Sequence, residues 1–153
     1  MTGVQTCALP IYEALKVCLA NTFAFYLKAH YFHWNVEGAH FASYHKFFQK
    51  IYEDAFDAVD AIAEHIRTLD AYAPGSFVRY NELKTIEDEI NIPPALSMMA
   101  KLLEDNAKVT ESLKAAFAIA DSQKMEGIAN FLADRIDTHA KHGWMIKAHL
   151  KGL

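Results

Sequence analysis

Residues 33–64 read HWNVEGAHFASYHKFFQKIYEDAFDAVDAIAE and contain a helix end, a tight turn and a long second helix. Gly38 supplies the left-handed backbone that ends a helix, and apolar residues recur at helical spacing on both sides of it. A chain that reverses here places two long helices side by side. We therefore predict an antiparallel helical hairpin in the first half of the chain.

Helical spacing continues outward from this hairpin. It predicts helices over residues 12–36, 40–71, 94–120 and 122–151. Pro74-Gly75 is expected to stop the second helix, and Asp121 or Ser122 to cap the fourth. Residues 76–92 are too polar for a core helix, so they form a long crossover with a short helix in it. Four helices joined by short, long and short connections predict an all-α, ferritin-like four-helix bundle.

Composition narrows the class of protein. The 153 residues are 52% hydrophobic with a net charge of −4, which indicates one folded domain and disfavours a nucleic-acid surface. No apolar run approaches the ~20 residues of a membrane span. Cys7 and Cys18 have neither metal-binding nor disulfide-framework spacing, as expected for a reducing cytoplasm.

The first eleven residues, MTGVQTCALPI, resemble the translation of a sequencing adapter. They lack the basic start and the long apolar stretch of a secretory leader. We interpret residues 1–11 as a non-native leader and residues 12–153 as a single domain. An ordinary N-terminal segment is the alternative, and it leaves the rest of the chain unchanged.

Four residues of the first half are candidate metal ligands: His33, His45, Asp60 and Glu64. Imidazole and carboxylate together suit a first-row transition metal such as iron better than calcium or magnesium. His33 and His45 flank the Gly38 turn at comparable depth, so both rings can approach one point. Asp60 and Glu64 share one face of the second helix.

The two halves of this set are too far apart within one chain. His45 and Asp60 are fifteen positions apart, which on one continuous helix is about 22 Å of rise. Two copies of the second helix, packed antiparallel about a two-fold axis near Glu53, would bring the His half of one beside the acid half of the other. The residues expected at that contact include Ile51, Tyr52, Ala55 and Phe56.

Other interpretations compete with this one. A lone histidine among aromatic residues is more often structural, and an Asp-x-x-x-Glu pair is usually a solvated helix face. A ferritin-like centre inside the bundle needs Glu-x-x-His on two helices. The single match, Glu37 to His40, straddles the turn. We therefore predict no in-bundle centre of that kind.

The HWNVEG motif, followed by His45 and by Asp60 and Glu64 within DAVDAIAEHI, resembles the signature of the Dps family, the mini-ferritins. The resemblance runs from about Ala14 to Leu150. It implies a shell of twelve subunits with ferroxidase sites at two-fold interfaces. His33 and His45 of one subunit and Asp60 and Glu64 of its partner would bind iron.

The resemblance also assigns neighbours and departures. Trp34 matches an aromatic residue beside the family site, with core packing as the alternative role. Many relatives carry a carboxylate where this chain has Gln49, which puts the second iron position in doubt. His30 would either support the site or pack.

The family's shells also have acidic iron-entry pores near the start of the last helix. Asp121, Glu126 and Asp134 occupy that region here, although Asn130 stands where an acid is expected. A polar helix start explains Asp121 equally well.

The resulting hypothesis is a cytoplasmic ferroxidase that oxidises Fe(II), with hydrogen peroxide as the implied oxidant, and stores ferric mineral in a hollow shell, protecting against oxidative damage. Two alternatives stay open. One is DNA compaction, which in the family depends on a basic tail, and the chain ends only in KAHLKGL. The other is a structural cage with impaired metal chemistry, which Gln49 would favour.

Overall fold

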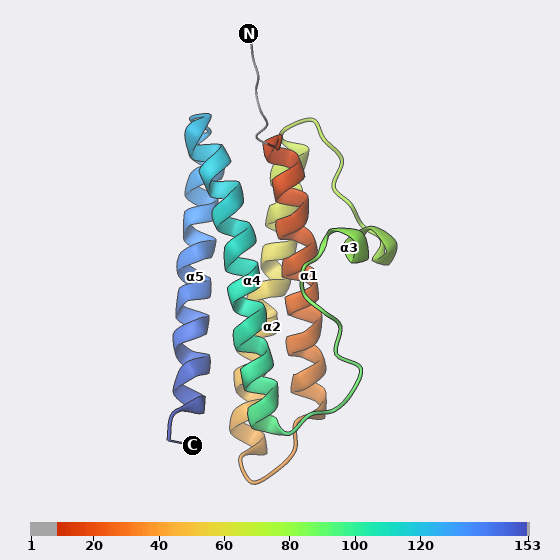
Figure 1. Cartoon of the computed structure of the whole chain (residues 1–153), viewed down its shortest axis with the longest axis vertical. Helices are drawn as coiled ribbons and strands as arrows, with labels where there is room; N and C mark the ends of the chain where they lie inside the picture. Colours follow the sequence, from red (N-terminus) through yellow and green to blue (C-terminus); the bar gives the residue numbers. More distant parts are fainter. Residues whose placement is uncertain (1–8, 153) are drawn as a thin grey trace.

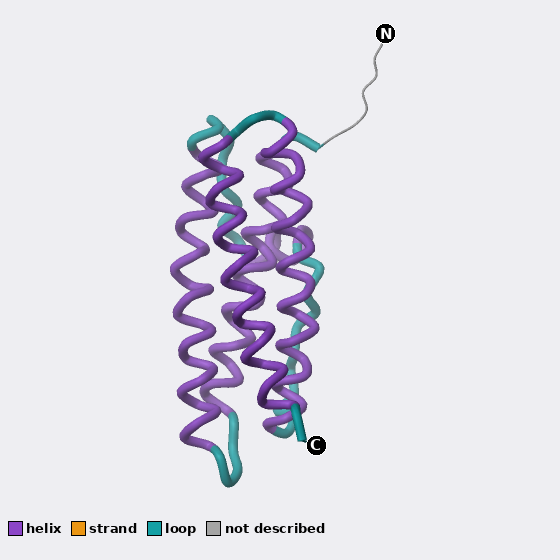
Figure 2. Tube along the Cα trace, turned by 90° about the vertical axis from the view of Figure 1, so that its left-hand side faces the viewer, coloured by secondary structure: helices purple, strands orange, loops and turns teal. Residues whose placement is uncertain are grey.

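The computed structural model describes residues 9–152, and it is an all-α bundle (Figure 1). The helices are α1 (Ile11–Asn35), α2 (Phe41–Arg67), α3 (Phe77–Leu83), α4 (Ala95–Ser122) and α5 (Glu126–Leu150). The four long helices run side by side, and the crossover from α2 to α4 carries the short α3 outside them. Helices and loops account for all of the described chain, without a strand (Figure 2). The predicted four-helix bundle with a helical crossover is confirmed.

The hairpin forms where the sequence predicts it. α1 ends at Asn35, and the backbone N–H of Val36 donates to the carbonyl of Phe32. Gly38 has a φ of +119°, a value that favours glycine because a Cβ would clash with the backbone. α2 then begins at Phe41, so only five residues join the two helices. This short turn fixes the depth at which residues of α1 face residues of α2.

Two helix boundaries differ from the prediction. α2 ends at Arg67, before Pro74-Gly75, because the Thr68 hydroxyl donates to the carbonyl of His65 at 2.7 Å and Asp70 takes a left-handed φ of +62°. A side chain that bonds the helix carbonyls and a left-handed residue together end a helix without proline or glycine.

At the other boundary, Asp121 and Ser122 do not cap the last helix. They form the last turn of α4, and the Ser122 hydroxyl donates to the carbonyl of Ile119. Lys124 makes the turn with a φ of +57°, and α5 begins at Glu126. The predicted cap was wrong because the Ser122 hydroxyl bonds back to a carbonyl of α4 and the left-handed turn comes two residues later, at Lys124.

The core lies along the bundle axis, where α1 packs against both α2 and α4. The largest fully buried side chains include Phe25, Phe32, Phe48, Leu15, Leu19, Ile51, Ile62, Met99 and Leu102. Each contributes about 1.5–3 kcal/mol through removal of its apolar surface from water. Ile11 is also buried, so the first helix starts inside the expected leader, of which residues 1–8 lie outside the described residues.

The crossover is fastened to α1 by side chains inside the structure. Asn21 is fully buried and makes two hydrogen bonds to Thr85, donating to its hydroxyl at 3.0 Å and accepting from its backbone N–H at 2.7 Å. Lys28 donates to the carbonyl of Glu87 at 2.7 Å and forms an ion pair with Asp105 of α4 at 2.7 Å. These contacts hold the crossover, and with it α3, against α1. No helix of residues 9–152 is long and apolar enough to cross a membrane.

Replacing Asn21 should weaken the attachment of the crossover to α1. Asn21→Ala leaves the backbone N–H of Thr85 without its acceptor, so we expect a loss of about 1–3 kcal/mol in the free energy of unfolding, measured by urea denaturation. The control is Asn91→Ala in the same crossover, because Asn91 is exposed and its hydrogen bonds, to Tyr31 and Glu89, are made by its backbone. Equal destabilisation by the two substitutions would contradict the claim that the Asn21 side chain holds the crossover against α1.

Candidate metal centre

His33 and His45 face each other across the hairpin and are fixed by reciprocal hydrogen bonds. His33 Nδ1 donates to the carbonyl oxygen of His45 at 2.7 Å, and His45 Nδ1 donates to the carbonyl oxygen of His33 at the same distance. The rings stack with centroids 3.7 Å apart and planes 15° apart. The prediction that the Gly38 turn brings both imidazoles to one point is confirmed.

This arrangement decides which ring nitrogen is available. A carbonyl oxygen only accepts hydrogen bonds, so the Nδ1 of each ring carries the hydrogen. In the neutral ring, Nε2 then holds a free lone pair, and it forms no hydrogen bond within residues 9–152. A histidine whose other nitrogen donates to a backbone carbonyl is the form in which proteins present imidazole to metals. The pair therefore fits a first-row transition metal such as iron.

Aromatic side chains surround the pair. The His30 ring stacks on the Tyr52 ring with centroids 3.8 Å apart. His30 Nδ1 and the Tyr26 hydroxyl share a hydrogen bond of 3.0 Å. Burial and the neighbouring His33 lower the pKa of His30. The rings of Trp34 and His30 have centroids 4.0 Å apart. Trp34 is nevertheless 58% exposed, so it does not pack in the core of the subunit. His30 is thus a packed and hydrogen-bonded neighbour of the pair.

The acid half of the predicted site lies on the same helix but far away. α2 is continuous from Phe41 to Arg67, so Asp60 lies about 22 Å along the axis from His45. Asp60 and Glu64 are exposed, and neither carboxylate forms a hydrogen bond or ion pair with another residue of 9–152. The part of the chain that the structure describes holds no group of three or more His, Cys, Asp or Glu able to bind one metal ion.

Two details of the predicted surroundings are now defined. The Gln49 amide donates to Glu53 Oε2 at 3.3 Å, which ties it to the next turn of α2. Ile51 and Ala55, expected at a contact between two copies of α2, are instead fully buried in the subunit's own core. That expectation was wrong because their direction on α2 is inward, toward α1. Phe56 is 56% exposed and remains on the outer face.

The predicted pore residues lie near the turn between α4 and α5. Asp121 is in the last turn of α4, Glu126 is the first residue of α5, and Asp134 lies about two turns further along. All three are exposed, as is Asn130 between them. Their role in a pore stays a prediction.

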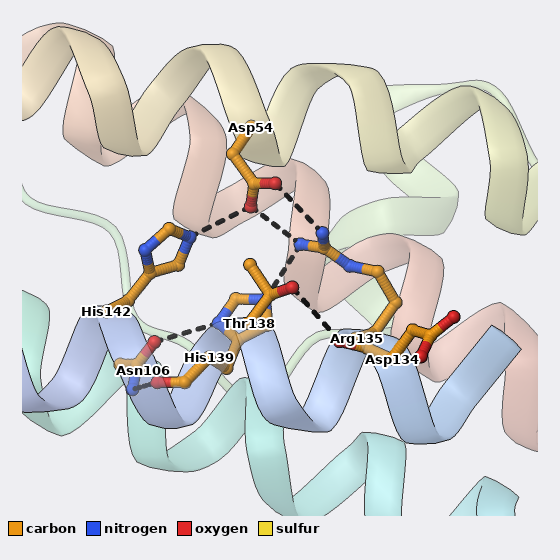
Figure 3. Close-up of polar contacts among 7 residues, drawn as sticks. All are labelled: Asp54, Asn106, Asp134, Arg135, Thr138, His139 and His142. Atoms are coloured by element: carbon orange, nitrogen blue, oxygen red, sulfur yellow. Dashed lines mark hydrogen bonds and ion pairs between the residues drawn. The ribbon is translucent and has the colours of Figure 1, made fainter. Parts of the chain in front are cut away.

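A second polar cluster lies inside the bundle, and sequence reasoning missed it (Figure 3). Asp54 of α2 accepts two hydrogen bonds from the Arg135 guanidinium of α5, at 3.0 and 2.9 Å, and a third from His142 Nε2 at 2.8 Å. Burial opposes ionisation of Asp54, but these hydrogen bonds outweigh it and hold the pKa of the carboxyl well below its usual range. The cluster fastens α2 to α5.

The cluster continues toward α4 through His139. Its Nδ1 is 2.8 Å from the Asn106 side-chain oxygen, and the Asn106 amide nitrogen donates to the His139 carbonyl at 2.9 Å. Burial, together with the charges of Arg135 and His142, lowers the pKa of His139 to about 3. The spacing of positions 135, 139 and 142 could have indicated this cluster in the sequence, because it places three polar side chains on one helix face among buried apolar residues.

Comparison with known proteins agrees with this fold and these motifs. The sequence profile of the ferritin-like domain family matches residues 12–153, so the chain is a ferritin-like protein. A DNA protection during starvation protein of Brevibacillus brevis is 30% identical over 87% of this chain and 89% of its own. An uncharacterised low-temperature-induced protein of Nostoc sp. is 30% identical over 93% of this chain and 80% of its own.

Solved structures extend the likeness to the backbone. The Dps protein of Vibrio cholerae O1, described as a member of a broad superfamily of ferritin-like diiron-carboxylate proteins, superposes with a TM-score of 0.89. It is 27% identical, and the match covers 97% of this chain and 100% of that one. The chain belongs to the Dps family, the mini-ferritins.

The buried His139 should make stability sensitive to acid. Its folded-state pKa lies below the unfolded value of about 6.5, so the unfolded chain takes up a proton that the folded protein excludes. The contribution of neutral His139 is therefore fully present above that pH and is lost toward pH 3, at about 1.4 kcal/mol per pH unit. We expect His139→Gln to flatten the pH dependence of the free energy of unfolding by about that slope.

The measurement is urea denaturation at several pH values between about 6 and 4, at one protein concentration. His40→Gln is the matched control, because His40 is exposed at the start of α2. Wild-type and His139→Gln proteins with parallel pH profiles would show that His139 does not exclude the proton.

Proposed function

We propose that this protein is a ferroxidase and iron-storage protein whose sites are shared between two subunits. The observation that carries the proposal is the His33–His45 pair, with both Nδ1 hydrogens fixed and both Nε2 atoms free. Two imidazoles hold a metal weakly without further ligands, and the nearest carboxylates of the predicted set are about 22 Å away on the same helix. Membership of a ferritin-like family supports iron as the metal handled.

A second copy of the chain supplies the missing half. Packing α2 against its symmetry copy would bring Asp60 and Glu64 of one subunit to the histidines of the other, and the same two-fold operation makes a second site. An apolar surface is available for this contact. Large apolar side chains are exposed on α1, α2 and α3: Leu27, Trp34, Phe56, Phe77 and Val78. Such a surface marks an interface more often than open solvent. The family resemblance extends the pair to a dodecameric shell.

The ligand set favours oxidation of the bound iron. Two carboxylates stabilise Fe(III) more than Fe(II), so they lower the cost of removing an electron. With hydrogen peroxide as oxidant, two Fe(II) ions give one electron each to the O–O bond of one peroxide, and hydrolysis of the two Fe(III) ions releases protons as the ferric mineral forms. Both reagents of hydroxyl-radical chemistry are consumed. A reducing compartment such as the cytoplasm is the proposed setting, because Cys18 is a free, buried thiol.

Mixing two inactive variants tests the shared site directly. One variant carries His33→Ala with His45→Ala, and the other carries Asp60→Ala with Glu64→Ala. Each alone should oxidise Fe(II) with peroxide no faster than buffer. After dissociation and reassembly of an equal mixture, half of the dimers are mixed and each holds one complete site, so about a quarter of the wild-type activity should return.

The oxidation is followed optically in anaerobic Fe(II)-loaded protein after addition of peroxide. The control mixes two batches of the same variant, which should stay inactive. No recovery in the reassembled mixture, from variants that assemble normally and are each inactive, would contradict a site built from two subunits.

The names of relatives raise a second candidate, direct protection of DNA by binding. Relatives from Brevibacillus brevis and Bacillus anthracis are called DNA protection during starvation proteins. The charge of this chain disfavours phosphate binding, because acidic residues outnumber Lys and Arg by 19 to 15. Removal of iron and peroxide would itself protect DNA without a bound duplex. A structural cage without metal chemistry is the third candidate, and inactive wild-type protein would favour it.

We expect no shift of duplex DNA by this chain in a gel at low salt, where electrostatic binding is strongest. The matched comparison is the same chain with a run of added lysines at its N-terminus, which should bind. A shift by the unmodified chain that weakens steeply with added salt would establish the DNA-binding function instead.

A further inference from the structure

We propose that the Arg135 guanidinium is a built-in cation that occupies a site of metal-ligand composition inside the bundle and keeps divalent transition metals out of it. Asp54, His139 and His142 surround the position (Figure 3). Removing the guanidinium should turn the same side chains into a site for one transition-metal ion.

Three donor atoms already converge on this one cation. Asp54 Oδ1 and Oδ2 accept from the two terminal nitrogens of Arg135 at 3.0 and 2.9 Å, and His139 Nε2 lies 3.2 Å from the second of them. A guanidinium can only donate, so His139 Nε2 accepts with its lone pair. A carboxylate and an imidazole lone pair are the donor types that first-row transition metals take.

The orientation of His139 is that of a metal ligand. The Asn106 amide nitrogen donates to the His139 carbonyl, which leaves the Asn106 oxygen to accept from Nδ1 at 2.8 Å. The hydrogen on Nδ1 therefore points away from Arg135 and the lone pair on Nε2 points toward it. An outer hydrogen bond that fixes the tautomer in this way is found at most metal-bound histidines.

The imidazole of His142 lies beside that of His139 and is a second potential ligand. His142 Nε2 donates to Asp54 Oδ2 at 2.8 Å, and its Nδ1 is buried without a hydrogen-bond partner among residues 9–152. The rings of His142 and His139 are 5.3 Å apart at 90°. A buried ring nitrogen without a partner is unusual, because burial of a polar atom costs free energy unless it is bonded.

Arginine is the residue that holds such a position most firmly. Its guanidinium does not lose its proton in proteins, so it cannot make way for a metal by becoming neutral, as lysine or histidine can. Arg135 is 8% exposed although the Asp54 side chain is 31% exposed, and the positive charge in contact with these donors disfavours a second cation on them. The exclusion of metals from the bundle would confine iron to the subunit interface, and this consequence rests on the proposed function. The exclusion itself does not depend on the proposed function.

Cobalt(II) binding tests the proposal in full-length protein that lacks the interfacial histidines. The background carries His33→Ala and His45→Ala, so that bound cobalt reports on the bundle. Without a further change, this protein should bind no cobalt in the bundle. Adding Arg135→Ala should give one cobalt per subunit by equilibrium dialysis, with the visible absorption of a nitrogen- and oxygen-ligated ion, and should make the Tm rise by roughly 5 °C with cobalt.

Two further variants separate this from incidental binding. Asp54→Asn added to Arg135→Ala removes the carboxylate and should abolish the gain. Arg79→Ala, which removes an exposed arginine of α3, should gain nothing.

The proposal is overturned if folded Arg135→Ala protein binds no more cobalt than its parent, or if the parent already binds cobalt through His139. It is also overturned if Arg135→Ala protein fails to fold both with and without cobalt, because the ion is expected to gather the same donors that the guanidinium does. None of these outcomes depends on ferroxidase activity.

Discussion

The pair of reciprocal hydrogen bonds between His33 and His45 is the constraint on which the candidate site depends. Each imidazole holds the backbone of the other helix, so the hairpin and the two candidate ligands are fixed by the same four atoms. The Gly38 turn sets the depth, stacking sets the ring planes, and the backbone carbonyls set the tautomers. Metal ligands prepared in this way lose little conformational entropy when an ion binds.

Under the proposed function, one protomer holds only half of the metal site. A straight helix separates the histidines from the nearest predicted acids by about 22 Å, and bending α2 enough to close that gap would break its hydrogen bonds. The interior of the bundle offers a different set of donors, but the Arg135 guanidinium occupies it. The proposed iron site lies on α1 and α2, whereas the Arg135 guanidinium fills the polar cluster between α2 and α5. In the proposed function, the bundle is the scaffold and a second subunit completes the site.

Much of this could be predicted from the sequence, because it follows from periodicity and turn chemistry. The helix count, the crossover and the approach of His33 to His45 all depend on local signals around Gly38 and on 3.6-residue spacing. The end of α2 at Arg67 could not, since it is decided by the Thr68 side chain and by a left-handed Asp70. The inward direction of Ile51 and Ala55 depends on which face of α2 meets α1. The cluster of Asp54, Arg135, His139 and Asn106 joins α2, α5 and α4, and residue spacing along one helix does not show its partners.

The central claim is that one metal ion is held by residues of two subunits. The most direct measurement is anomalous scattering at the iron edge from crystals loaded with Fe(II) under anaerobic conditions. The account predicts an iron peak bounded by His33 and His45 of one subunit and Asp60 and Glu64 of its symmetry partner, with the bundle interior free of iron. An iron peak whose protein ligands all come from one subunit would contradict it.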